Sequence, residues 1–171
     1  MTQYDTDGDG LLNSAELEKS PGLNAAKETL DTNGDDLVSE EEIVARIESW
    51  LESRAGLFAV SCSVTLDKRS LSGTTVTFEP EPFLGDGIKT AIGKTSSFGL
   101  TSPSVPKENR PSPDMPPGIQ PGLYLVKVSK IVNGSETIPA KYNTETILGQ
   151  QISNDDPAIM RHSIVLDLKT K

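Results

Sequence analysis

The chain has 171 residues, of which 35% are hydrophobic and 5% aromatic, and no apolar run reaches the length of about 18 residues that a transmembrane helix needs. Its formal net charge is −9; residues 1–55 hold 14 acidic and 4 basic side chains, whereas residues 56–171 hold 11 and 12. The lack of an apolar run of that length predicts no membrane span. Because no basic stripe is present to neutralise phosphates, we also expect no nucleic-acid partner.

Residues 1–54 are predicted to form short helices around two acidic loops. Met1–Tyr4 leave no room for a helix before the first loop, which indicates a piece of a longer protein. A helix over residues 14–20 is expected to stop at Ser20-Pro21-Gly22. Apolar spacing predicts two more helices, the first carrying Leu23, Ala26, Lys27 and Leu30, the second with an apolar face of Ile43, Ile47, Trp50 and Leu51.

The first acidic loop, Asp5–Glu16, has the spacing of a twelve-residue calcium loop. Calcium takes about six to eight oxygen ligands, and such a loop supplies them from positions 1, 3, 5, 7, 9 and 12, with glycine at position 6. Gly10 stands at position 6. The candidate ligands are Asp5, Asp7, Asp9, the Leu11 carbonyl, Asn13 through a water, and Glu16.

The second loop, Asp31–Glu42, repeats this spacing 26 residues further along the chain. It departs at position 6, where Asp36 replaces glycine and must adopt a left-handed backbone at some energetic cost. Its candidate ligands are Asp31, Asn33, Asp35, the Leu37 carbonyl, Ser39 and Glu42. Together the two loops predict Ca²⁺ as the ligand, with one or two ions per chain.

Two features outside the ligand set support this prediction. Leu12 and Val38, both at position 8 of their loops, can pair the loops through a short β-bridge. Asn13 and Ser39 each precede a glutamate by three residues, so both can cap the outgoing helices.

From Leu57 onward the apolar period changes to two, which is typical of strands. Strands without intervening helices indicate an antiparallel sandwich or a small barrel. Residues 101–121 contain seven of the twelve prolines, so we expect a long surface loop there rather than a docking ligand for a partner. The predicted strands are Val60–Leu66, Thr74–Glu79, Leu123–Ile131 and Ser163–Leu168, with turns at Leu71-Ser72-Gly73 and Asn133-Gly134.

The chain has one cysteine and one histidine, Cys62 and His162. Cys62 lies in an alternating run, where we expect a small buried thiol rather than a nucleophile. No motif supports a catalytic dyad with His162, and no nucleophile–base pair is visible elsewhere, so we do not expect an enzyme.

Residues 1–54 resemble an EF-hand pair, and the resemblance covers both loops residue by residue. Residues 59–170 resemble the carboxypeptidase-regulatory or transthyretin-like β-sandwich, in the stretches Val64–Asp67, Leu71–Phe78 and Pro121–Val128. The usual Asp-Gly turn of that family is replaced by Asp67-Lys68-Arg69, so a different turn is expected. The combination of these stretches with Glu81–Asp86 and Ile138–Thr146 is similar to planctomycete-type bacterial proteins that have no known activity.

These observations predict an α+β chain of two domains: an EF-hand pair over residues 1–54 and an antiparallel β-sandwich over residues 59–171, joined through Ser53–Leu57. The predicted function is a module in which Ca²⁺ stabilises the EF-hand pair. The alternative is an adhesion or docking module whose sandwich binds a protein or carbohydrate partner. We expect the sandwich to persist when the metal is removed. The full-length protein is expected at the cell envelope or outside the cell.

Overall fold

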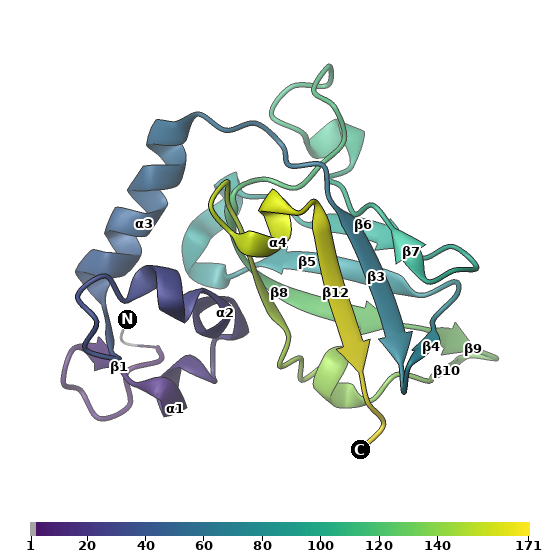
Figure 1. Cartoon of the computed structure of the whole chain (residues 1–171), viewed down its shortest axis with the longest axis horizontal. Coiled ribbons are helices and arrows are strands. Elements are labelled where there is room, and N and C mark those ends of the chain that lie inside the picture. Colours follow the sequence, from purple (N-terminus) through teal and green to yellow (C-terminus); the bar gives the residue numbers. More distant parts are fainter. Residues whose placement is uncertain (1–2) are drawn as a thin grey trace.

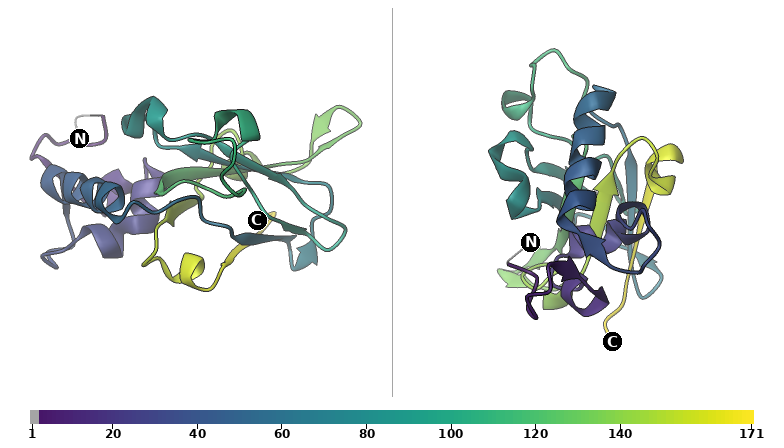
Figure 2. Two further views of the ribbon diagram at one scale, coloured as in Figure 1. Left: turned by 90° about the horizontal axis from the view of Figure 1, so that it is seen from above. Right: turned by 90° about the vertical axis from the view of Figure 1, so that its left-hand side faces the viewer.

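The computed structural model describes residues 3–171, so Met1 and Thr2, part of the segment before the first loop, lie outside the described residues. The chain has an α+β fold in which short helices come first and sheets follow (Figure 1). We call residues 3–54 the helical unit and residues 57–171 the sheet unit. The helical unit lies at one end of the long axis of the molecule, as the views of Figure 2 also show.

The helical unit contains three helices and one pair of very short strands. Both outgoing helices begin with the predicted capping boxes, because the side chains of Asn13 and Ser39 accept hydrogen bonds from the amides of Glu16 and Glu42. Pro21 begins the middle helix, a position where proline is favoured. The elements are β1 (Leu11–Leu12), α1 (Ser14–Leu17), α2 (Pro21–Leu30), β2 (Val38–Ser39) and α3 (Glu40–Ser53).

The sheet unit has two sheets of four strands that share one hydrophobic core. Side chains alternate between core and solvent along the strands, and β12 buries Ile164, Leu166 and Leu168 while exposing Val165. One sheet has the order β11 (Gly149–Ile152), β8 (Gly122–Ser129), β5 (Thr75–Pro80), β6 (Ala91–Lys94). The other has β12 (Ser163–Leu168), β3 (Ser61–Leu66) and β4 (Arg69–Ser70), with β7 (Leu100–Thr101) also paired to β3.

One strand pair corrects the expectation of purely antiparallel sheets. β12 pairs with β3 in parallel, from Ser163 opposite Ser61 to Leu168 opposite Leu66, whereas the other strand pairs among residues 3–171 are antiparallel. Alternating burial is the same in parallel and antiparallel strands of a half-buried sheet, so the sequence pattern cannot report the direction. α4 (Pro157–Met160) immediately precedes β12.

Tight turns connect the hairpins of the sheet unit. Asp67 and Lys68, between β3 and β4, both have positive φ angles, of 48° and 65°. An Asp-Gly turn has the same two positive φ angles, so the expectation of a different turn is wrong: the residue types differ, but the sign of both φ angles does not. Asn133 and Gly134 form the turn between β9 (Ile131–Val132) and β10 (Ser135–Glu136), at φ of 51° and 80°. Both turns twist in the sense that antiparallel strands require.

The proline-rich segment 101–121 is irregular but is fixed at both ends. Val105 and Ile119 are fully buried in the core of the sheet unit, and Ile119 exchanges backbone hydrogen bonds with Phe58. The remaining regular elements are three 3-10 helices, Pro82–Gly87, Lys107–Asn109 and Ala140–Tyr142.

The two units share an interface that the sequence pattern did not predict. Leu123 of β8 is fully buried, and it belongs to the core of the helical unit rather than to the core between the sheets. α2 packs against β8 and β11. The approach is very close at Gly149, where a Cβ atom would lie 1.7 Å from the carbonyl oxygen of Pro21. Any side chain at Gly149 would therefore push α2 away from the sheet.

Polar contacts accompany this packing. Arg46 of α3 donates to the carboxylate of Asp155 at 2.6 and 2.8 Å, to Gln151 at 3.0 Å and to Ser153 at 3.0 Å. The hydroxyl of Thr29 of α2 lies 3.1 Å from the same Gln151 oxygen. The helical unit is thus held to the sheet unit by apolar burial and by bonds to one end of β11.

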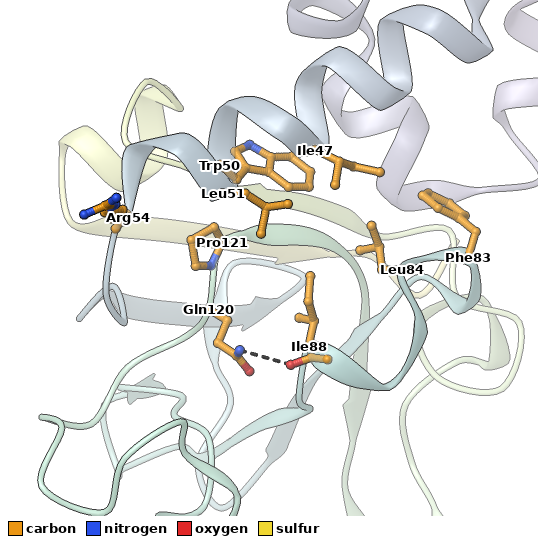
Figure 3. Close-up of a pocket in the computed structure, with 11 residues that line it drawn as sticks. Ile47, Trp50, Leu51, Arg54, Phe83, Leu84, Ile88, Gln120 and Pro121 are labelled. Atoms are coloured by element: carbon orange, nitrogen blue, oxygen red, sulfur yellow. Dashed lines mark hydrogen bonds between the residues drawn. The ribbon is translucent and has the colours of Figure 1, made fainter.

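Leu51 corrects the predicted apolar face of α3. Ile43 and Trp50 are buried as expected, but Leu51 is 74% exposed because it points away from the core into a surface groove (Figure 3). This groove lies between α3 and the 3-10 helix Pro82–Gly87 and has a volume of about 540 Å³. Its apolar lining comprises Ile47, Trp50, Leu51, Phe83, Leu84, Ile88 and Pro121.

The shared interface predicts that the two units unfold together. Leu123→Ala removes a fully buried side chain from the helical core and is expected to lower the free energy of unfolding by about 2–5 kcal/mol. Urea titration followed by Trp50 fluorescence and by far-UV circular dichroism should shift by the same amount with both probes. Val165→Ala, at a position that is 61% exposed, is the control and should change little. Separate transitions, of which only the fluorescence one moves, would contradict this prediction.

The Arg46–Asp155 pair predicts a pH dependence. Hydrogen bonds from Arg46 lower the pKa of Asp155 to about 2, so its stabilising contribution is present above the ordinary value of 3.8 and is lost as the pH falls toward 2. Asp155→Asn is therefore expected to lower the free energy of unfolding by the same amount at pH 7 and pH 5, and by less at acid pH. The loss of stability should stay below about 1 kcal/mol because the Asp155 side chain is 52% exposed. Asp114→Asn, on the exposed proline-rich segment, is the control.

Candidate metal centre

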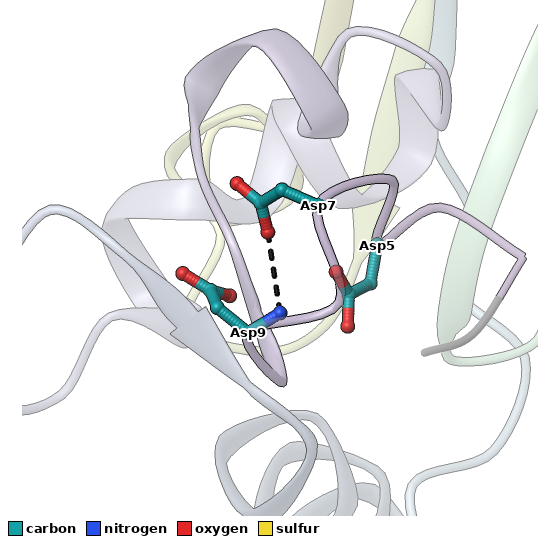
Figure 4. Close-up of side chains that lie close together, drawn as sticks. All are labelled: Asp5, Asp7 and Asp9. Atoms are coloured by element: carbon teal, nitrogen blue, oxygen red, sulfur yellow. Dashed lines mark hydrogen bonds between the residues drawn. The ribbon is translucent and has the colours of Figure 1, made fainter.

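Three carboxylates gather on the first acidic loop. Oxygen atoms of Asp5, Asp7 and Asp9 lie within 4.8 Å of one another, on the turn that Figure 4 shows. Asp7 and Asp9 are exposed, and Asp5 is partly buried. Hard oxygen ligands at this spacing suit a hard divalent cation such as calcium.

The same loop is held by hydrogen bonds from its own backbone. Asp5 accepts from the amides of Gly8 and Gly10 at 2.7 and 3.1 Å, and Asp9 accepts from Leu11 at 2.8 Å. Asp7 accepts from the amide of Asp9 at 3.2 Å. The carboxylates therefore point toward the inside of the loop, because the loop amides point there too.

The second loop repeats this pattern position by position. Asp31 accepts from Gly34 at 2.7 Å and from Asp36 at 2.9 Å, as Asp5 does from Gly8 and Gly10. Asp35 accepts from Leu37 at 2.9 Å, as Asp9 does from Leu11. The third side chain, Asn33, is an amide that bonds both the backbone and the carboxylate of Asp35. The second loop therefore offers one carboxylate fewer than the first.

The last residue of each loop folds back over it. Glu16, 2% exposed, accepts from the amides of Thr6 at 2.6 Å and Asn13 at 3.0 Å, and these bonds lower its pKa to about 2. Glu42 accepts from the amides of Thr32 and Ser39, both at 2.9 Å. Although burial alone would raise the pKa of Glu42, these bonds lower it to about 2. Both carboxylates are thus kept ionised, as metal ligands must be.

The remaining predicted ligands lie beside these carboxylates, on the short strands and at the helix caps. Leu11 and Ser39 are paired across β1 and β2, and Leu12 pairs with Val38 as expected. The side-chain oxygens of Asn13 and Ser39 cap α1 and α3, so their expected role as ligands through water stays a prediction. Leu37 donates its amide to Asp35, and its carbonyl role is likewise a prediction.

Position 6 differs between the loops in the way the sequence indicates. Gly10 has a φ of 86°, where glycine carries no penalty. Asp36 has a φ of 65°, which costs more for a residue with a side chain. Its carboxylate is exposed and lies 3.3 Å from Lys27. Such exposed pairs contribute little to stability.

The threonines at position 2 of the loops were not among the predicted site residues. Thr6 and Thr32 each donate a hydroxyl, besides the amide, to the glutamate at position 12, at 2.9 and 3.0 Å. The signal was present in the sequence, because the same residue type occupies position 2 of both loops.

Cys62 is fully buried between the sheets, as expected, and burial raises the pKa of its thiol to about 12. A thiol that holds its proton so firmly is a poor nucleophile. His162 lies on the surface before β12, with its backbone carbonyl bonded to Ser61.

Comparison of the chain with protein-family models, with curated proteins and with solved structures finds no match in any of the three. Among residues 3–171, no helix has both the length and the apolar character needed to cross a bilayer.

The backbone of Asp36 predicts a stabilising substitution. Asp36→Gly relieves the left-handed strain and loses only an exposed ion pair, so the free energy of unfolding in calcium is expected to rise by about 0.5–1 kcal/mol. Asp36→Asn removes the charge but keeps the side chain, and should change stability less. Thermal unfolding of the three proteins measures both effects. A less stable glycine variant would mean that Asp36 has a further role.

Proposed function

We propose that this chain is a calcium-binding module in which residues 3–54 form an EF-hand pair that binds one or two Ca²⁺ ions. The observation that carries the proposal is the repetition of one hydrogen-bond pattern in both loops. In each loop, the carboxylate at position 1 accepts hydrogen bonds from the backbone amides of positions 4 and 6, and the carboxylate at position 5 accepts one from the amide of position 7. The glutamate at position 12 accepts from the amides of positions 2 and 9. The shared pattern supports the same ligand arrangement in both loops.

The residues of the loops fit a hard cation. Asp5, Asp7 and Asp9 place three carboxylates within 4.8 Å of one another, where like charges repel unless a cation lies between them. A bound calcium ion would supply that positive charge and accept their oxygens. The Thr6 and Asn13 amides hold the Glu16 carboxylate ionised at the closing end of the loop.

The packing of the helical unit supports a structural role for the ion. A calcium sensor opens its helix pair to expose an apolar groove. Here the buried side chains of Ile43 and Trp50 share a core with Leu123 of the sheet unit. Opening the pair would uncover this shared core, so we propose that the ions stabilise the unit instead of switching it.

The sheet unit is proposed to be a transthyretin-like β-sandwich that supports the calcium-binding pair. Its two sheets with a common core fit this proposal. Docking to a protein or carbohydrate is the second candidate. The exposed side chains of Phe98 and Leu100, at 78% and 48%, favour it on the sheet unit.

Calcium titration tests the proposal directly. Isothermal titration calorimetry of the unmutated chain should give one or two sites. Glu16→Gln removes a charge and one good oxygen from the first loop and is expected to weaken that site by at least about tenfold. Glu52→Gln, an exposed charge change on α3, is the matched control and should leave both sites unchanged. Equal titration curves for Glu16→Gln and the unmutated chain would refute the assignment.

Removal of calcium gives a second test. Chelation leaves the loop carboxylates to repel one another, so the helical unit should loosen and the Trp50 emission should shift to the red. Enhanced binding of an apolar dye on calcium addition would instead indicate a sensor.

A further inference from the structure

Glu81 is a buried carboxylate that belongs to neither loop. It lies in the sheet unit, between β5 and the 3-10 helix Pro82–Gly87, and is 1% exposed. One of its oxygens accepts from the Ser20 hydroxyl at 2.8 Å and from the Gly22 amide at 2.8 Å. Burial raises the pKa of this carboxyl, and the donors from the helical unit oppose that rise. A buried carboxylate is costly unless its partners are fixed in place.

Glu81 contacts residues on both sides of the first loop. Tyr4, which directly precedes Asp5, is 7% exposed, and its ring packs edge-on against Phe83 at 6.3 Å. The Tyr4 hydroxyl lies 3.5 Å from the second oxygen of Glu81, at the outer limit of a hydrogen bond. Ser20 follows Glu16, the last residue of the loop, by four positions. The contacts of Glu81 thus bracket the loop.

The geometry at Gly22 shows how closely the carboxylate is fitted. A Cβ atom at Gly22 would lie 2.7 Å from both the Cγ and the Oε1 of Glu81. Only glycine lets the amide approach to hydrogen-bond distance.

Gln151 stands in the same relation to the second loop. It lies on β11 and is 1% exposed. Its side-chain oxygen accepts from Arg46 at 3.0 Å. It also lies 3.1 Å from the hydroxyl of Thr29, two residues before Asp31, whose single proton is shared with the Ala26 carbonyl at 2.9 Å. Arg46 follows Glu42 by four positions, as Ser20 follows Glu16. Each loop therefore has one buried polar side chain of the sheet unit that contacts the segments before and after it.

We propose that Glu81 and Gln151 are positioning residues for calcium, the first for the loop Asp5–Glu16 and the second for the loop Asp31–Glu42. The inference rests on the proposed calcium function and deepens it. Neither residue touches the ion. Each fixes the distance between the entry and the exit of its loop, so that less conformational freedom is lost when the ligands close. The sheet unit is thereby part of the binding site, and calcium affinity and docking of the units are linked.

The test measures each site alone. The Glu42→Gln background isolates the first site and the Glu16→Gln background isolates the second. Glu81→Gln, which keeps the shape but not the charge, should weaken the first site by about fivefold and leave the second unchanged. Gln151→Met, which removes the acceptor, should weaken the second site by about fivefold and leave the first unchanged. Calorimetric titration of the full chain gives all four affinities.

Controls separate positioning from general damage. Glu79→Gln removes a neighbouring carboxylate that pairs with Lys127 on the sheet surface, and should change neither site. If Glu81→Gln does not fold, Ser20→Ala removes one donor to the same carboxylate and should weaken only the first site.

The outcomes distinguish this inference from the function on which it rests. No calcium binding by the unmutated chain overturns both. Normal binding with unchanged affinities in the Glu81 and Gln151 variants overturns the inference alone. Equal weakening of both sites by either variant would reduce it to a general loss of stability, and so would also overturn it.

Discussion

The folded structure of the helical unit depends on the packing of α2 against β8 and β11. A unit of about fifty residues buries a small share of its surface, so its stability is marginal without further contacts. Leu123 of the neighbouring sheet closes one side of the core of the helical unit. Because Gly149 has no side chain, α2 can approach the sheet closely enough to pack against Leu123. The bonds of Glu81 and Gln151 then cross the same contact. Removal of the sheets would leave the helical core open on one side.

The loops could be predicted from sequence because their geometry is local. Spacing alone decides which carboxylates share the inside of a twelve-residue turn, so Asp5, Asp7 and Asp9 fall together. The caps at Asn13 and Ser39 depend on a glutamate three positions away. The four predicted strands also followed from a local signal, the alternation of burial that β12 keeps over its whole length, whereas β6 and β11 were not predicted.

The remaining features depend on residues far apart in the chain. Leu51 is exposed because the sheet unit does not cover it, and the apolar spacing along a helix cannot show what covers each position. The pairing of β3 with β12 is parallel because of the path of the chain between them. Glu81 meets Ser20 across 61 positions, and Gln151 meets Thr29 across 122. A single sequence carries no pattern that links such distant positions, so these contacts had to be found in the structure.

The parallel pair also sets an order of events in time. β3 is among the first strands of its unit to leave the ribosome, whereas its neighbour β12 is the last. Contacts between such distant segments form slowly, because a long chain must first be brought together. Cys62 and Val64 therefore stay without their neighbouring strand while about a hundred further residues are synthesised. During that interval one edge of β3 is unpaired, and unpaired strand edges make a partly folded chain prone to aggregate.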